Sequence, residues 1–299
     1  MVSPEEKETF RSGFISIIGR PNAGKSTLLN ALLGEKISIV TPKPQTTRKT
    51  IRGVLNAPGC QMVFVDTPGI HRARGLLNEF MVREALSTLS DVDVILYMVE
   101  ADRPVSEDDR FIMEGLKGLK APVVLAVNKI DKVAKARLLP LIEEYSKLHG
   151  FASVVPISAL TGDGLDVLTG ELAGLLPEGP RYFPEDMITD EPERVIVAEI
   201  IREKVFLATR QEIPYSVAVV IEEFKEGEGL ISISAAINVE RDSQKGMVIG
   251  RGGRMLKRIG TEARSEIESL LGVKVFLKLF VRVQKDWTRS PGALKEFGY

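Results

Sequence analysis

The sequence predicts an α/β domain with a mostly parallel sheet and helices on both faces, followed by a smaller α+β domain. Short apolar runs alternate with helical patterns over residues 13–176, as in chains that build parallel sheets. A proline-rich break follows, and beyond it the element order changes to helix, two extended runs, helix and strand. The length of 299 residues suits one full core plus a second module.

The first domain is expected to contain a six-stranded sheet. Five segments are almost continuously apolar, because both faces of a parallel sheet are buried. These segments are residues 14–18, 62–65, 92–99, 123–127 and 154–157. Residues 50–55 add a sixth, which we expect at the edge of the sheet. The helices are expected over residues 25–33, 76–89, 107–119, 135–148 and 166–175, with Gly34 closing the first.

The break between the domains holds four prolines and an acidic cluster. The second domain is then expected to run through a helix (194–209), extended segments (216–224 and 230–240), a glycine-rich stretch, a helix (260–271) and a strand (274–283). The predicted limits are an N-terminal extension (1–12), a nucleotide-binding domain (13–176), a linker (177–193), a second domain (194–285) and a tail (286–299).

Composition excludes several classes of protein. The single cysteine, Cys60, cannot form an internal disulfide and suits a reducing compartment. The acidic N-terminal residues do not predict a signal peptide, and the apolar runs are shorter than the ~20 residues that span a bilayer. We therefore expect a cytoplasmic protein. Since the net charge is −1, a nucleic-acid partner would have to meet a local basic patch.

A glycine-rich motif follows the first strand and opens the first helix, where backbone N–H groups and the helix N-terminus can hold phosphates. Lys25 is expected to reach the β- and γ-phosphates, and the Ser26 hydroxyl to bind Mg²⁺. The phosphate-binding residues are predicted to be Gly19, Arg20, Pro21, Asn22, Ala23, Gly24, Lys25, Ser26 and Thr27.

Two further segments are predicted to surround the γ-phosphate. Asp66, Thr67, Pro68 and Gly69 follow the strand at 62–65, where Asp66 can hold a Mg²⁺-bound water and the Gly69 N–H can meet the phosphate. The other segment is a polar loop whose switch residues are Gln45, Thr46, Thr47, Arg48 and Lys49. One threonine is expected to bind Mg²⁺; Thr47 is favoured, and the choice between Thr46 and Thr47 stays open.

The base is predicted to be guanine. The Asp131 carboxylate can accept hydrogen bonds from guanine N1–H and the exocyclic amine, whereas adenine would leave its charge unpaired. Asn128 is expected to bridge toward the base or the phosphate loop, and the Lys129 stem to cover the ring. A backbone N–H of the segment Ser158, Ala159 and Leu160 can meet guanine O6. These features predict a GTPase that forms GDP and phosphate, with Lys25, Thr47 and Gly69 as catalytic residues.

The residue after Gly69 bears on the hydrolysis rate. Ile70 stands where Ras-like proteins carry a water-orienting glutamine, and its side chain can neither donate nor accept a hydrogen bond. His71 is a weaker candidate for a base, because positioning the water needs geometry more than basicity. We therefore predict slow intrinsic turnover.

A basic glycine-rich loop in the second domain predicts single-stranded RNA binding. Residues 251–258 hold four basic residues and no acidic one. A G-x-x-G loop lets a nucleic-acid backbone approach closely. The predicted RNA contacts are Ile249, Gly250, Arg251, Gly252, Gly253, Arg254, Lys257 and Arg258. Trp287 is interpreted as a half-buried aromatic at the domain edge, with base stacking as the alternative.

These motifs resemble the Era family of ribosome-assembly GTPases. The resemblance rests on G-R-P-N-A-G-K-S-T at 19–27, K-P-Q-T-T-R at 43–48, D-T-P-G-I-H at 66–71 and the G-x-x-G loop, and it covers nearly the whole chain. It implies a P-loop GTPase domain followed by a type II KH domain. It also implies binding to the 3′ end of 16S ribosomal RNA, a role in maturation of the 30S subunit and peripheral contact with the inner membrane.

The resemblance leaves some properties open. Related potassium-activated GTPases carry an asparagine at the position of Asn22 that helps to hold K⁺, whereas the alternative is that Asn22 only shapes its loop. We expect a monomer. The alternative function is a signalling or cell-cycle GTPase whose C-terminal domain binds a protein or the membrane surface.

Overall fold

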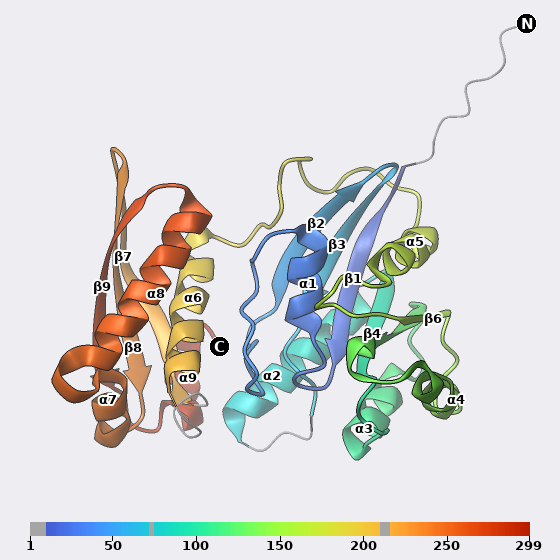
Figure 1. Cartoon of the computed structure of the whole chain (residues 1–299), viewed down its shortest axis with the longest axis horizontal. Coiled ribbons are helices and arrows are strands. Elements are labelled where there is room, and N and C mark those ends of the chain that lie inside the picture. The colour runs from blue at the N-terminus through green and yellow to red at the C-terminus, as the bar shows by residue number, and fades with distance from the viewer. Residues whose placement is uncertain (1–9, 72–74, 210–215) are drawn as a thin grey trace, which may run out of the picture. The chain divides into compact units, whose positions relative to one another are not determined.

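The computed structural model describes residues 10–71, 75–209 and 216–299, which form two compact units (Figure 1). The first unit contains residues 10–37, 49–71 and 81–190, and the second contains 38–48, 75–80, 191–209 and 216–299. The segment 38–48, which was expected in the first domain, therefore groups with the second unit. Most of the predicted N-terminal extension lies outside the described residues, and the predicted domain limits stay predictions.

The first unit is built on a six-stranded sheet of order β2-β3-β1-β4-β5-β6. Its strands are β1 (Arg11–Gly19), β2 (Ile51–Ala57), β3 (Cys60–Asp66), β4 (Val94–Glu100), β5 (Val123–Asn128) and β6 (Ser153–Pro156). β2 runs antiparallel to its neighbour and lies at the edge as expected, and the other pairs are parallel. The carboxyl ends of the five parallel strands therefore meet at one edge of the sheet, where open α/β sheets bind ligands.

Helices pack on both faces of this sheet (Figure 1). They are α1 (Lys25–Leu33), α2 (Leu76–Ser87), α3 (Glu107–Leu116), α4 (Leu138–Ser146) and α5 (Leu165–Leu175). Leu28 of α1 and Leu168 of α5 share one apolar core with Leu96 of β4. The next residue of β4, Tyr97, points to the opposite face, because side chains alternate along a strand. Its hydroxyl donates to Asp109 of α3 over 2.6 Å.

Two helix limits differ from the prediction by three residues. α3 ends at Leu116 rather than at residue 119, and Gly118 then adopts a positive φ of 82°, which helical backbone does not allow. The predicted helix 135–148 starts with a 3₁₀ turn, and α4 begins only at Leu138.

The second unit contains α6 (Glu193–Ala208), β7 (Ala218–Gly227), β8 (Leu230–Val239), α7 (Asp242–Ile249), α8 (Arg254–Leu271), β9 (Lys274–Val283) and α9 (Pro291–Glu296). The sheet has the order β7-β8-β9, with β7 antiparallel and β9 parallel to β8. α6 and α8 cover one face of it (Figure 1). Ile200, Ile259, Ile233 and Val275 meet in the core between these layers. This α+β arrangement confirms the predicted fold class of the C-terminal part.

The sequence prediction missed two helices of this unit and shortened a third. α7 occupies part of the stretch expected to be only glycine-rich, and α9 lies in the predicted tail. α8 begins at Arg254 rather than at residue 260. The predicted helix started at Gly260, but a single glycine within a helix costs only about 1 kcal/mol, which packing overcomes. Within the described ranges, no helix is long and apolar enough to cross a membrane.

Candidate functional site

The glycine-rich loop joins β1 to α1 in a conformation that its glycines require. Gly24 has a φ of 101°, and a Cβ there would lie 2.3 Å from Nδ2 of Asn128. No other residue fits this position without displacing Asn128. Asn22 also adopts a positive φ, 66°, which asparagine tolerates better than most residues. The loop is therefore shaped by its own sequence and packed against the end of β5.

Lys25 is buried at the start of α1. Its Nζ donates to the carbonyl oxygens of Gly19 (3.2 Å) and Arg20 (3.1 Å). Burial lowers the pKa of Lys25 to about 8, although the charges of Asp66 and Glu100 oppose this shift. A desolvated ammonium of this kind gains from a phosphate partner, because the phosphate charge offsets the cost of burial.

Phosphate binding should restore the Lys25 pKa, so nucleotide binding should take up protons. With a pKa of about 8, Lys25 is deprotonated in about three quarters of the free molecules at pH 8.5 and in about a tenth of them at pH 7. GDP binding should therefore take up about three quarters of a proton per molecule at pH 8.5 and about a tenth at pH 7. The affinity for GDP should fall as the pH rises above 8. Calorimetric titration in two buffers of different ionisation heat measures the uptake. Equal uptake at the two pH values would contradict the assignment.

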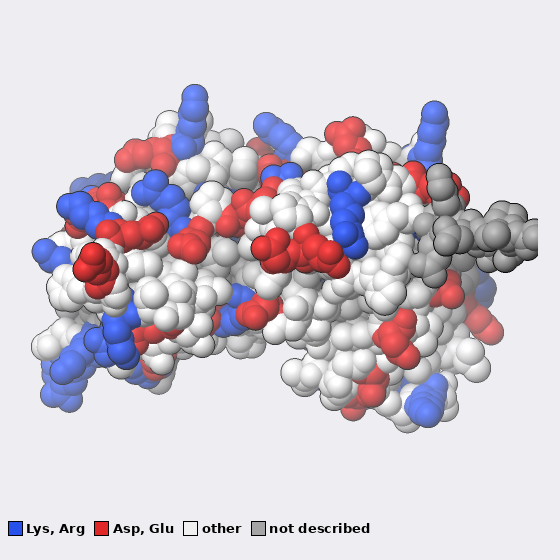
Figure 2. Space-filling view, turned by 90° about the horizontal axis from the view of Figure 1, so that it is seen from above, with Lys and Arg blue, Asp and Glu red and all other residues white. Residues whose placement is uncertain are grey.

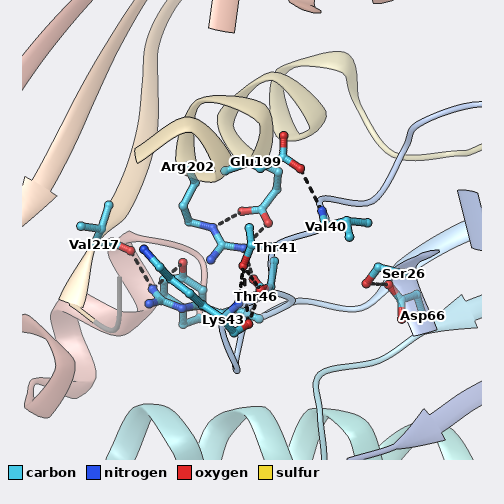
Figure 3. Close-up of polar contacts among 12 residues, drawn as sticks. Ser26, Val40, Thr41, Lys43, Thr46, Asp66, Glu199, Arg202 and Val217 are labelled. Atoms are coloured by element: carbon cyan, nitrogen blue, oxygen red, sulfur yellow. Dashed lines mark hydrogen bonds and ion pairs between the residues drawn. The ribbon is translucent and has the colours of Figure 1, made fainter. Parts of the chain in front are cut away.

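Two oxygen-bearing side chains meet at the start of α1 and the end of β3. The Ser26 hydroxyl donates to the carboxylate of Asp66 over 2.7 Å (Figure 3). Asp66 is buried at the ligand edge of the sheet. A hydroxyl and a carboxylate so close together fit Mg²⁺, which takes few protein oxygens and completes its shell with phosphate and water. The prediction that Ser26 and Asp66 share one metal site agrees with this geometry.

The segment after β3 lies against the glycine-rich loop. The Thr67 hydroxyl donates to the carbonyl oxygen of Ile17 over 2.7 Å, and the Ile70 N–H donates to that of Gly19 over 3.0 Å. A Cβ on Gly69 would lie 2.6 Å from the backbone nitrogen of Pro21. Gly69 therefore permits close contact between the two loops. The Ile70 side chain is completely buried, and as an aliphatic group it can form no hydrogen bond with a water at the γ-phosphate.

Asn128, the last residue of β5, joins two loops at the ligand edge. Its Nδ2 donates to the carbonyl oxygen of Ala23 over 2.8 Å, and its Oδ1 accepts from the Ala159 N–H over 2.9 Å. Lys129 donates to the carbonyl oxygen of Asn22 over 2.7 Å and forms an ion pair with Glu100. Sequence analysis missed Glu100, although an acidic residue at the carboxyl end of β4 is a signal of the same kind as Asp66.

The predicted guanine-binding carboxylate lies beside the segment 158–160. Asp131 is exposed and accepts a hydrogen bond from the Ser158 hydroxyl over 2.7 Å. Ser158 and Ala159 are buried, whereas Leu160 is 77% exposed. The hydroxyl orients the carboxylate and leaves its second oxygen for a base.

Arg20 fixes the glycine-rich loop to α3. Its Nε lies 3.3 Å from Oδ1 of Asp109, which is completely buried. The other carboxylate oxygen of Asp109 accepts from the N–H and hydroxyl of Ser106 at the start of α3. Asp109 is a second residue that sequence analysis missed, because only the packing of α3 on the sheet brings it to Arg20.

Residues 45–48 of the predicted switch segment group with the second unit, together with the preceding residues 38–44, whereas Lys49 groups with the first unit (Figure 3). The carbonyl oxygen of Thr46 accepts from Arg202 of α6. Lys43 donates to the carbonyl oxygens of Phe206 and Thr209 at the C-terminal end of the same helix, where positive charge is favoured. The Val40 N–H donates to Glu203 over 2.9 Å.

Arg48 of the switch segment is almost fully buried. It donates to the carbonyl oxygen of Val217 over 2.7 Å. The rings of Phe206, Trp287 and Tyr299 lie 5.8–5.9 Å from its guanidinium carbon. Burial lowers the pKa of Arg48, and these rings and the carbonyl replace part of its lost hydration.

Two predictions concern residues of this neighbourhood. Trp287 is completely buried and donates to the carbonyl oxygen of Ser216 over 2.9 Å, so the base-stacking alternative is wrong and the residue is more deeply buried than predicted. The Thr46 hydroxyl lies 2.7 Å from that of Thr41, and Thr47 is buried. Neither observation selects the Mg²⁺ ligand, so the preference for Thr47 stays a prediction.

The predicted RNA loop joins α7 to α8. Gly250, Gly252 and Gly253 have φ values of 71°, 59° and 74°. Arg251, Arg254, Lys257 and Arg258 are exposed, whereas Ile249 is only partly exposed. In Figure 2, Lys and Arg side chains gather on part of the second unit's surface, while charges of both signs mix elsewhere on the drawn face.

A groove of about 400 Å³ lies beside this loop. It is lined by Gly253, Leu256, Lys257, Gly260, Thr261, Arg264, Leu277 and Leu279. Two of the predicted RNA residues, Gly253 and Lys257, therefore face it. Thr261 and Arg264, which also line the groove, were not predicted. Their spacing from Lys257 was a local signal, because positions 257, 261 and 264 lie on one face of a helix. The two leucines come from β9, which only the fold brings to α8.

Both domains of the chain match known protein families. A family model described as "50S ribosome-binding GTPase" matches residues 14–129, and a KH domain model matches residues 212–288. The GTPase Era of Geotalea uraniireducens is 60% identical over 98% of this chain and 99% of its own length. The chain belongs to the Era family. This membership confirms the fold class predicted for both domains, and it makes the chain a GTPase.

Solved structures of Era extend the comparison. A variant of Aquifex aeolicus Era bound to GDP·AlF4⁻ is 45% identical, with a TM-score of 0.94, and the match covers 97% of this chain and 99% of that one. A structure of Era in complex with MgGDPNP and nucleotides 1506–1542 of 16S ribosomal RNA gives the same identity, coverage and TM-score. The Era family fold therefore includes the described parts of both units.

Proposed function

We propose that this chain is a GTP-driven switch that binds the 3′ end region of 16S ribosomal RNA through its KH domain and assists assembly and maturation of the 30S subunit. The observation that carries the proposal is the groove between α8 and β9, which the glycine loop and Lys257 border. Its apolar floor suits bases, and its basic rim suits the phosphate backbone. The groove lies within the segment that matches the KH domain model, and a relative was solved in complex with this RNA.

Residues at the ligand edge of the first unit are assigned to GTP. Lys25 binds the β- and γ-phosphates, the Gly69 N–H binds the γ-phosphate, and Asp131 reads guanine through its free carboxylate oxygen. Asn128 positions the phosphate loop against the 158–160 segment. Ser26, Asp66 and Thr47 of the switch segment would hold Mg²⁺, which neutralises charge that develops on the phosphates. Lys25, Gly69 and Thr47 are the proposed catalytic residues.

Slow intrinsic hydrolysis is expected, because the aliphatic side chain of Ile70 has no hydrogen-bonding group with which to orient the attacking water. Turnover without a partner should be on the order of 10⁻⁴ to 10⁻² s⁻¹, as in GTPases without a complete catalytic set. Single-turnover phosphate release from purified protein measures this rate. Ile70→Ala should leave it within about threefold, whereas a fast rate that collapsed in this variant would contradict the account.

Asn22 is a candidate K⁺ ligand, and its left-handed backbone supports the alternative that it only shapes the loop. Hydrolysis rates in KCl and NaCl distinguish the two roles, since equal rates would rule out Asn22 as a K⁺ ligand.

We also propose that the chain is cytoplasmic and monomeric, with peripheral contact with the inner membrane. Flotation with vesicles and sedimentation of the purified chain test these proposals.

RNA crosslinking in the GTP-analogue state tests the RNA proposal. Sequencing of the crosslinked RNA from whole cells should recover the 3′ end of 16S ribosomal RNA. The same experiment with GDP supplies the comparison for the switch. Recovery of no RNA, or of RNA without preference for this region, would refute the proposed partner.

A further inference from the structure

The sheet of the second unit has an outer face that the helices leave uncovered. The inward set of β9, which includes Val275, Leu277, Leu279 and Val281, packs in the core with α6 and α8. Since side chains alternate along a strand, the other set of β9 points away from these helices. This outward set consists of Lys274, Phe276, Lys278, Phe280 and Arg282.

The C-terminal segment covers only one end of this outer face. Ala218 and Val220 of β7 pack with Trp287, Leu294 and Phe297. In the strand register, Val220 lies beside Ala236 of β8, which is followed by Phe280 of β9. The next outward-facing pairs along these strands, Ser234 with Lys278 and Ser232 with Phe276, lie further from the C-terminal segment. Phe276 is 58% exposed and Phe280 is 37% exposed.

Exposed rings on a strand are a platform for nucleobases. Phe276 and Phe280 are four residues apart on one face of β9, which places them roughly 13 Å apart along the strand. Ser232 and Ala236 are the neighbours of Phe276 and Phe280 on β8, and their short side chains cover neither ring, although the Lys278 ammonium lies over the ring of Phe280. Stacking on such rings accepts any base, because every base has a π-face.

The charges of this face suit a phosphate backbone. Glu222 forms an ion pair with Arg282, and Glu223 forms one with Lys225, so these two carboxylates are balanced. Lys278 adds positive charge between the two rings, and its Nζ lies 4.9 Å from the centroid of Phe280. A cation between two stacking rings can contact the phosphate that links the stacked nucleotides.

The outer face is continuous with the groove beside the glycine loop. β9 is an edge strand, and its inward residues Leu277 and Leu279 line the groove. Phe276, Lys278 and Phe280 alternate with these leucines on the other side of the same strand. An RNA strand that leaves the groove therefore has to cross only the free edge of β9 to reach the two rings.

We propose that Phe276, Lys278 and Phe280 form a second binding strip for single-stranded RNA, which takes nucleotides that flank those held in the groove. The strip rests on the proposed RNA-binding function and extends its site from one side of β9 to both. It recognises stacked bases and backbone charge, so it contributes affinity and direction rather than a fixed base sequence.

The test compares a short and a longer RNA. A tetranucleotide fills the groove alone, since a KH loop clamps about four nucleotides, whereas a strand of about twelve nucleotides from the 3′ end of 16S ribosomal RNA can also reach the strip. The double variant Phe276→Ala/Phe280→Ala should bind the longer RNA at least about tenfold more weakly and the tetranucleotide unchanged. Lys278→Gln should reduce the salt dependence for the longer RNA by about one charge.

Phe111→Ala provides a matched control, because Phe111 is an exposed aromatic of similar accessibility, 39%, on α3 of the first unit. It should change neither affinity, and unchanged melting and GTP binding should show that all variants fold. Equal affinity of the wild type and the double variant for the longer RNA would overturn the strip. Loss of binding to phosphatidylglycerol vesicles instead of RNA would also overturn it. Failure of the wild type to bind either RNA would refute the proposed function itself.

Discussion

Asp131→Asn should weaken GTP binding by about 10²- to 10⁴-fold and transfer preference to xanthosine triphosphate. The carboxylate accepts from guanine N1–H and the exocyclic amine, and each hydrogen bond to a charged group contributes roughly 1.5–3 kcal/mol. Asparagine keeps one acceptor and places an N–H₂ group against the guanine amine. Xanthine carries a carbonyl at that position and can accept from the new amide. The Ser158 hydroxyl can still donate to the amide oxygen, so the loop should keep its shape.

Competition binding with GTP, ATP and xanthosine triphosphate measures this change. Asp163→Asn is the matched control, because Asp163 is an exposed carboxylate of the same loop region that accepts from the Thr161 hydroxyl over 2.8 Å. It should bind GTP like the wild type. If Asp131→Asn kept its preference for GTP, the guanine would have to be read by another group.

Gly252→Asp should reduce affinity for the 16S ribosomal RNA 3′ end by at least about 10²-fold while GTP binding stays unchanged. The substitution places a carboxylate where the RNA backbone approaches the loop, so it adds repulsion and blocks close contact. Folding should tolerate it, because nothing lies within 4 Å of a Cβ at Gly252. The φ of 59° is one that aspartate adopts more readily than most residues.

Two variants separate the causes of this loss. Gly252→Asn has nearly the same shape without the charge, so it should lose much less affinity. Gly272→Asp makes the identical change at the other end of α8, at a glycine with a φ of 68° and equally open space. It should bind RNA almost normally. If Gly272→Asp and Gly252→Asp weakened binding equally at one salt concentration, net charge rather than the loop would explain the effect.

Local patterns were sufficient to predict most of the architecture. Continuous apolar runs predicted the parallel strands, because burial of both faces leaves little room for polar residues. The helix 25–33 and the strand 274–283 have the predicted limits. The prediction failed where local signals were weak or misleading. The sequence of α7 contains few apolar residues, so it has no clear helical pattern. Gly260 lies inside α8 without interrupting it.

The candidate nucleotide site could be predicted for a related reason. Asp66 and Asn128 each end a parallel strand, and Lys25 follows β1 across the glycine-rich loop, so the topology of the sheet places all three at one edge. The position of Glu100 at the end of β4 follows the same rule, but its pairing with Lys129 and the pairing of Asp109 with Arg20 do not follow from strand ends. Asp109 and Glu100 hold Arg20 and Lys129 through pairs that are distant in sequence. No local period encodes such pairs.

The order of elements, the guanine-nucleotide motifs and the basic glycine loop could all be identified without coordinates, because each depends on residues close together in the chain. Three other features became visible only in the folded chain: the switch segment packs on α6, Trp287 is buried, and α8 and β9 enclose a groove. These features depend on contacts between distant segments, whose free energy comes from packing and desolvation.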